Sequence, residues 1–91
     1  MIPSGHQRAF RKNDKVFWVL VQDEIVLRNY ATNVAVQLGS DQRRVWELLD
    51  GAHTGDQIVQ HLSGDASVKI RANEIFDLIA TLEAGGFLFA S

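Results

Sequence analysis

An uncharged, strand-like segment runs directly into an amphipathic helical segment near the middle of the chain. Residues 33–38 read Asn-Val-Ala-Val-Gln-Leu and alternate larger apolar side chains with polar or small ones, as half-buried strands do. Ser40 suits a helix N-cap, and the apolar Val45 and Leu48 follow at helical spacing. Gly51 suits the position after the helix. In a chain of 91 residues, this junction predicts a small sheet lying beside a helical bundle.

Two further strand-like segments precede this junction. Residues 16–21 form a continuous apolar, β-branched and aromatic run, and residues 25–30 form a second strand-like segment. Only short links join these segments to each other and to residues 33–38, whereas parallel neighbours need long crossovers. The three segments therefore predict a three-stranded antiparallel meander.

Two more helices are expected after the first. Thr54 and Gln57 have the spacing of a capping box, which opens a helix that ends near Gly64. Residues 70–84 carry a wide apolar stripe, stop at two glycines and lead into an apolar tail that we expect to pack on the core. The sequence thus predicts an α+β, winged-helix-like fold, in which a three-stranded antiparallel sheet is followed by three helices in the order βββααα.

Length and composition indicate a single domain preceded by an arm. Residues 1–14 are polar and basic and include Pro3 and Gly5, so we expect a flexible basic arm, with residues 15–91 forming one domain. The chain has no cysteine, no apolar segment of signal-peptide length and no run long enough to span a membrane. We therefore expect a soluble, cytoplasmic protein with no membrane partner.

No arrangement of side chains in the sequence indicates catalysis. His6, His53 and His61 have neither a carboxylate nor a second histidine at metal-ligand spacing. The serines lack the context of an activated nucleophile, and the glycine pair after residue 84 follows a helix instead of opening one as a phosphate loop does. We expect no enzyme activity, no catalytic residue, no metal site and no cofactor.

Residues 33–38 are the candidate binding site. From Ala31 to Ser40 the chain has no charged residue and no proline to discourage strand pairing. If this strand lies at a free edge, its unpaired N–H and C=O groups can accept a guest strand, while the long helix supplies side-chain specificity. Burial of its alternating apolar side chains in the core is the simpler role, and the two roles are compatible because they use different surfaces. The same edge is open to pairing with a second copy, which would give a homodimer.

A winged-helix DNA-binding transcriptional regulator is the alternative function for this topology. Such a protein needs a recognition helix with several basic or amide side chains. The second expected helix has no Lys or Arg, and in the third Lys69 and Arg71 are followed by acidic residues. Together with the net charge of −2, this pattern favours a protein with no nucleic-acid partner.

Several of these features together resemble the PqqD-like family. They are an apolar strand pair, residues 45–51 reading Val-Trp-Glu-Leu-Leu-Asp-Gly, Thr54 followed by Gln57-Ile-Val, and residues 82–88 reading Leu-Glu-Ala-Gly-Gly-Phe-Leu. The similarity covers roughly residues 16–89. Members of this family are precursor-peptide recognition elements in pathways that make ribosomally synthesised, post-translationally modified peptides. Many members open the first helix with Asn after Leu, where this chain has Gly39-Ser40, and Ser caps equally well.

The resemblance implies a non-catalytic domain that binds the leader segment of a precursor peptide. In the family, the leader adds as a strand antiparallel to the third strand, in the groove between that strand and the third helix. Carried over by position, the implied contacts are Asn33, Val34, Ala35, Val36, Gln37 and Leu38 on the strand, and Arg71, Glu74, Ile75 and Leu78 on the helix. The implied partners are the precursor peptide and a separate peptide-modifying enzyme or leader protease. An adaptor that binds only the enzyme is a further alternative.

Overall fold

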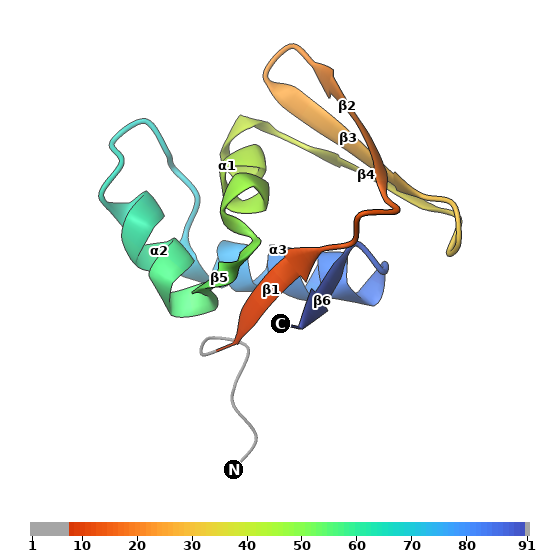
Figure 1. The fold of residues 1–91 in the computed structure, drawn as a ribbon. Coiled ribbons are helices and arrows are strands. Elements are labelled where there is room, and N and C mark those ends of the chain that lie inside the picture. Colours follow the sequence, from red (N-terminus) through yellow and green to blue (C-terminus); the bar gives the residue numbers. More distant parts are fainter. Residues whose placement is uncertain (1–7, 91) are drawn as a thin grey trace.

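The computed structural model describes residues 8–90 and has an α+β fold, as the sequence predicts (Figure 1). Within these residues, the strands form two three-stranded antiparallel sheets, and three helices pack with them. The strict βββααα order is wrong, because strands also lie before the meander, between the first two helices and after the last helix. The additional strands make up the second sheet.

The predicted antiparallel meander is present as one of the two sheets. β2 (Phe17–Val21), β3 (Glu24–Asn29) and β4 (Val34–Leu38) lie in this order, with β3 in the centre. Ile25 and Leu27 of β3 are buried, whereas the side chains that alternate with them face outward. The meander therefore turns one face to the core and leaves β2 and β4 as its two edges.

The three expected helices are present, and the second has the predicted cap. The Thr54 hydroxyl accepts a hydrogen bond from the Gln57 backbone N–H at 3.2 Å, and the Thr54 N–H donates to Gln57 Oε1 at 2.8 Å. No helix within residues 8–90 has the length and apolar character needed to cross a membrane. The helices are α1 (Ser40–Leu48), α2 (Gly55–Ser63) and α3 (Ala72–Ala84).

The sequence did not predict the second sheet, which lies below the meander in Figure 1. It consists of β1 (Ala9–Lys12), β5 (Asp50–Thr54) and β6 (Leu88–Ala90), in the order β5-β1-β6. Segments that are far apart in the chain thus lie side by side, with β1 paired antiparallel to both neighbours. This sheet joins the two ends of the described chain to the connection between α1 and α2.

The expected flexible arm is corrected by the structure where β1 forms. Phe10 is 1% exposed, while the flanking Arg11 faces solvent, so strand alternation fixes this basic segment to the core. The prediction for residues 1–14 is therefore wrong at Ala9–Lys12, and residues 1–7 lie outside the described residues. At the other end, the apolar tail packs on the core as expected, since Leu88 of β6 is 1% exposed.

One hydrophobic core unites both sheets and all three helices. Its side chains come from every layer, so removal of any one helix would expose part of it to water. The most deeply buried members are Phe10, Leu27, Val45, Leu49, Ile58, Ile75, Leu82, Phe87 and Leu88.

Three polar side chains bond to the two glycines that follow α3, and we call them the α3 clasp: Asn13 from the segment before β2, and Asn29 and Thr32 from the meander. Asn29, only 4% exposed, donates from Nδ2 to the carbonyls of Gly85 and Gly86 at 3.2 and 2.9 Å. Thr32 Oγ1 donates to the Gly85 carbonyl at 3.0 Å, and Asn13 Nδ2 donates to the Gly86 carbonyl at 3.0 Å. Gly86 has a φ of 78°, and a Cβ there would lie 2.6 Å from Asn29 Nδ2, so the position requires glycine.

Candidate peptide-binding groove

The outer edge of β4 has no strand partner among residues 8–90. β4 pairs antiparallel with β3 along its whole length, from Val34 opposite Asn29 to Leu38 opposite Ile25. No other strand of the described chain neighbours it. One side of its backbone therefore has no strand paired with it within the described residues.

The register of the meander identifies which backbone groups point to this open edge. β2 and β3 are joined by a two-residue turn that closes on the pair Val21–Glu24, and such a closing pair exchanges hydrogen bonds. Even-numbered residues of β3 therefore bond to β2, and odd-numbered residues bond to β4. Because those odd-numbered residues face Val34, Val36 and Leu38, the free N–H and C=O groups belong to Ala35 and Gln37.

A groove of about 350 Å³ runs between β4 and α3. Leu38 and Leu78, which are 2% and 8% exposed, supply its most buried apolar surface. Polar side chains from β4, α1 and α3 surround this surface. The lining residues are Val36, Gln37, Leu38, Gln42, Glu74, Asp77, Leu78 and Thr81. The open strand edge and one face of α3 are thus the two walls of a single site.

The groove carries negative charge. Glu74 and Asp77 are both exposed on α3, and no Lys or Arg is among the residues that line it. Glu74 Oε1 accepts one hydrogen bond, from the backbone N–H of Arg71 at 3.3 Å, and this contact leaves its carboxylate facing solvent. The groove is therefore electrostatically complementary to a cationic segment and unfavourable to an acidic one.

A second hollow, of about 320 Å³, continues the groove toward the beginning of α1. The two hollows share Gln42 and Glu74, so they form one continuous depression. Lys69 lines the second hollow, and its backbone N–H donates to Asp41 Oδ2 at 3.3 Å. The depression is thus acidic along α3 and mixed in charge near α1.

The predicted contact residues divide between the groove and other places. Val34 is half-buried in β4, and Ala35 is exposed at its open edge. Asn33 lies in the turn before β4, Arg71 is the N-cap residue of α3, and Ile75 is 2% exposed in the core and does not line the groove. The predicted residues that the structure brings together along the groove are Val36, Gln37, Leu38, Glu74 and Leu78.

Sequence reasoning missed three residues of the groove: Gln42, Asp77 and Thr81. Asp77 and Thr81 follow Glu74 at intervals of three and four residues, so helical spacing from Glu74 was the available signal. Gln42 gave no such signal, because its place depends on the cap of α1. That cap is Gly39 instead of the expected Ser40, and the Gly39 N–H donates to Gln42 Oε1 at 2.9 Å.

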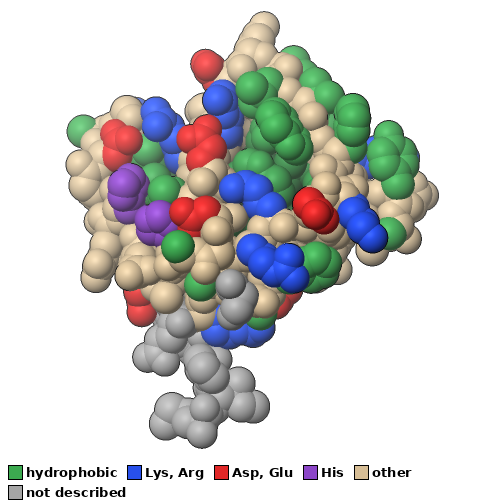
Figure 2. Space-filling model, in the orientation of Figure 1, with side chains coloured by type: hydrophobic (Ala, Val, Ile, Leu, Met, Phe, Trp, Pro, Cys, Tyr) green, Lys and Arg blue, Asp and Glu red, His purple; other side chains and the backbone are tan. Residues whose placement is uncertain are grey.

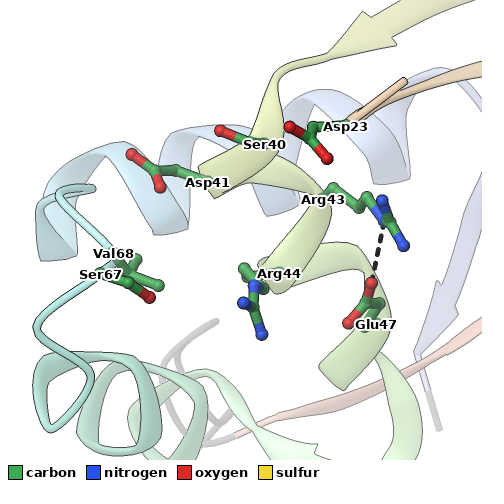
Figure 3. A pocket seen from close by; sticks show the side chains of 8 residues that line it. All are labelled: Asp23, Ser40, Asp41, Arg43, Arg44, Glu47, Ser67 and Val68. Carbon is green, nitrogen blue, oxygen red and sulfur yellow. Dashed lines mark hydrogen bonds and ion pairs between the residues drawn. The ribbon is translucent and has the colours of Figure 1, made fainter. Parts of the chain in front are cut away.

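A larger hollow, of about 440 Å³, lies between α1 and the segment that precedes α3 (Figure 3). Charged side chains of both signs line it, and Arg43 Nε donates to Glu47 Oε1 at 3.0 Å. None of the described residues that line it is a histidine or a cysteine. The lining residues are Asp23, Ser40, Asp41, Arg43, Arg44, Glu47, Ser67 and Val68. With three acidic and two basic side chains, this is a surface hollow of mixed charge in which no arrangement of side chains indicates a reactive group.

Asp50 and His53 form an exposed pair that the sequence did not predict. His53 Nδ1 lies 2.9 Å from both carboxylate oxygens of Asp50, and this hydrogen bond is the main cause that holds the pKa of Asp50 below its usual range. The backbone N–H of Ala52 also donates to Asp50 Oδ1, at 2.9 Å. Among residues 8–90, no group of three or more His, Cys, Asp or Glu is placed to hold a metal ion. The pair thus links the first and fourth residues of β5 through a side-chain hydrogen bond.

No protein-family profile matches the chain, and no curated protein matches it in sequence. Two solved structures share its fold. The first, TbiB1 in complex with the TbiA(beta) leader peptide, has a TM-score of 0.66 and 22% sequence identity over 86% of this chain and 93% of that one. The second, the heterocyclase TruD, has a TM-score of 0.65 and 19% identity over 92% of this chain but only 12% of TruD. The chain therefore has the fold of a protein that was solved with a leader peptide, and of a small part of a heterocyclase.

Proposed function

We propose that this chain is a non-catalytic protein that binds the leader segment of a ribosomally made precursor peptide and presents it to a maturation enzyme. The observation that carries the proposal is the open edge of β4, which faces α3 across a groove. The fold shared with TbiB1, a protein solved with a leader peptide, supports it, as does the resemblance of the sequence to the PqqD-like family.

The leader adds to β4 as an antiparallel strand. Its backbone bonds to the free N–H and C=O groups of Ala35 and Gln37, and apolar side chains on its inner face pack on Val36 and Leu78. Ordering a flexible peptide costs free energy, so we expect micromolar to sub-micromolar affinity, on the order of −8 to −10 kcal/mol. Bound in this way, the precursor is concentrated beside the enzyme, by the effective-concentration effect of tethering.

The proposal is tested by titrating this protein into a fluorescently labelled leader segment of the precursor peptide encoded beside its gene. We expect saturable 1:1 binding and no binding of the same residues in scrambled order. Absence of saturable binding up to about 100 μM, well above the expected micromolar range, would contradict the proposal. Capture of a maturation enzyme without any leader binding would instead support the adaptor that contacts only the enzyme.

The acidic wall of the groove predicts that the leader carries Lys or Arg where it faces α3. Asp77→Lys should weaken leader binding by about threefold to tenfold, because it replaces attraction by repulsion at an exposed position. The loss should shrink in about 0.5 M salt, where exposed charges are screened. Anisotropy titrations at both salt concentrations measure the effect.

Ala80→Lys is the matched control for Asp77→Lys. Ala80 is exposed on the same helix but does not line the groove, so the control adds a cation to α3 without reversing a groove charge. Asp77→Lys changes the net charge by two units and Ala80→Lys by one. If Ala80→Lys costs half as much binding free energy as Asp77→Lys, or more, general charge and no contact in the groove is responsible.

α2 and α3, the two helices that could act as a DNA-recognition helix, do not favour the alternative of a winged-helix transcriptional regulator. α2 and α3 contain no Lys or Arg, and α3 presents Glu74 and Asp77 to solvent. Phosphate contacts supply most of the affinity of such proteins, and these helices offer no cation for them. We therefore propose no nucleic-acid partner.

A further inference from the structure

β2, at the opposite edge of the meander from β4, is apolar and exposed on both faces. Its five residues read Phe-Trp-Val-Leu-Val, and each is between 44% and 58% exposed. The strand carries no charge, no proline and no paired outer neighbour among the described strands, so it lacks the features that usually protect an edge. Figure 2 shows hydrophobic side chains gathered over this part of the meander. Such an edge is a surface for association.

The core does not extend beneath β2. Trp18 and Leu20 lie directly opposite Leu27 and Ile25, so they share the inner face of the sheet, yet each remains about half exposed. Beside them a mainly apolar groove of about 260 Å³ separates β2 from Trp46 of α1. This groove leaves the inner face of β2 accessible to another apolar surface.

We propose that two copies of this chain associate through β2, in antiparallel orientation, to form one sheet with three strands from each copy. Because Phe17, Val19 and Val21 exchange hydrogen bonds with β3, the free backbone groups of β2 belong to Trp18 and Leu20. Pairing centred on Val19 places Trp18 of one copy opposite Leu20 of the other. Both sets of free backbone groups are then satisfied, as two-fold symmetry requires.

The charges at the two ends of β2 complement each other in this arrangement. Lys15 precedes the strand and Asp23 follows it, and both are exposed. Antiparallel pairing centred on Val19 places Lys15 of each copy opposite Asp23 of the other. The symmetric dimer therefore has two such pairs of opposite charge. A strand with this charge distribution is complementary to the same strand of a second copy.

The other edge of the meander is unfavourable to a second copy. Pairing through β4 would bring the acidic wall formed by Glu74 and Asp77 close to the same wall of the second copy. Repulsion between like charges therefore opposes association there and leaves β4 to a different partner. The acidic wall beside β4 and the uncharged edge of β2 together favour β2 as the edge through which two copies pair. This inference does not depend on what β4 binds.

Sedimentation velocity over a range of protein concentrations tests the proposal. The wild-type chain should sediment as a dimer, at twice its mass of 10.2 kDa. Val19→Lys places two ammonium groups directly opposite each other at the two-fold axis and should raise the dimer dissociation constant roughly tenfold or more. Tyr30→Lys, which adds the same charge at an exposed apolar residue outside β2, should leave the dimer unchanged. Circular dichroism confirms that both variants are folded.

A charge exchange gives a second, independent test. Lys15→Asp and Asp23→Lys should each weaken the dimer, and the doubly exchanged protein should regain most of the wild-type association, because the opposite charges again face each other. A wild-type chain that remains monomeric up to roughly 100 μM would overturn the proposal, and β2 would then be open to some other partner. A Val19→Lys protein as dimeric as wild type would overturn it equally.

Discussion

Replacing Gln37 by proline should weaken leader binding by about tenfold to a hundredfold while leaving the protein folded. The Gln37 N–H points away from β3, so its loss removes a hydrogen bond to the guest strand but none within the meander. The proline ring also occupies space at the edge that the guest strand must approach. Isothermal titration calorimetry with the labelled leader measures the loss, and urea unfolding shows whether the fold is retained.

Gln37→Ala is the matched control for this substitution. Both variants lose the Gln37 side chain, which donates from Nε2 to Glu24 Oε2 at 2.9 Å, and only the proline variant loses the backbone donor. We expect the alanine variant to bind within about threefold of wild type, since its remaining loss is one exposed side-chain contact. If both variants bind equally well, the leader does not pair with the backbone of β4.

The same register predicts a different outcome at the next residue. The Val36 N–H points toward β3, so Val36→Pro should break the ladder of the meander itself. We expect this variant to unfold at lower urea concentration than Gln37→Pro. The comparison separates damage to the sheet from damage to its open edge.

Replacing Asn29 by alanine should lower the free energy of unfolding by about 2–3 kcal/mol. This buried side chain donates to two carbonyls at the end of α3 and accepts from the backbone N–H of Ala31 at 3.0 Å. Its removal leaves a cavity and deprives buried polar groups of a hydrogen-bond partner. Each of these changes is a known cause of a large loss of stability. Urea denaturation followed by circular dichroism measures the change.

Asn73→Ala provides the control for Asn29→Ala. Asn73 is exposed on α3, outside the α3 clasp, and its replacement should change stability by no more than about 0.5 kcal/mol. Similar unfolding midpoints for the two variants would mean that Asn29 contributes little to stability. A large loss confined to Asn29→Ala would identify the clasp as a principal link between α3 and the meander.

The meander and the helices were predictable because their patterns are strong and local. Residues 16–38 contain apolar strand-like runs joined by short links, and the later helices carry apolar stripes with recognisable stops. The second sheet lacked such signals. β6 has only three residues, and β5 reads Asp-Gly-Ala-His-Thr, which resembles a loop. These strands depend on pairing with β1 across long sequence separations, which no local pattern reveals.

β1 was not predicted from the sequence, because its charged residues are typical of a solvated segment. Arg11 and Lys12 suggested a solvated arm, yet the single aromatic residue Phe10 fixes the segment in the core. Lys12 lies above the Trp46 ring, 5.2 Å from its centroid, and donates from Nζ to the Leu49 carbonyl at 3.2 Å. The basic residue thus packs along apolar surface instead of extending into solvent. Composition alone does not distinguish these two arrangements.

The sequence indicated the elements that border the groove more accurately than the residues that line it. β4 and α3 do form the groove, but the rotation of α3 about its axis decides which side chains face it. Successive helical residues point about 100° apart, and the apolar stripe of α3 is wide enough to include both Leu78 in the groove and Ile75 in the core. Only the packed structure fixes that rotation, so the sequence could not show that Ile75 lies in the core or that Asp77 and Thr81 line the groove.

The central position of β3 separates the two rims of the meander, and this arrangement has a consequence for stoichiometry. A leader peptide bound along β4 and a second copy paired along β2 lie at opposite edges of the meander, so neither obstructs the other. A dimer would then hold two leader peptides at the two outer edges of one continuous sheet. Seven strand spacings separate them, which is roughly 30–35 Å. An enzyme with two active sites at matching separation would encounter two substrates in a single docking event.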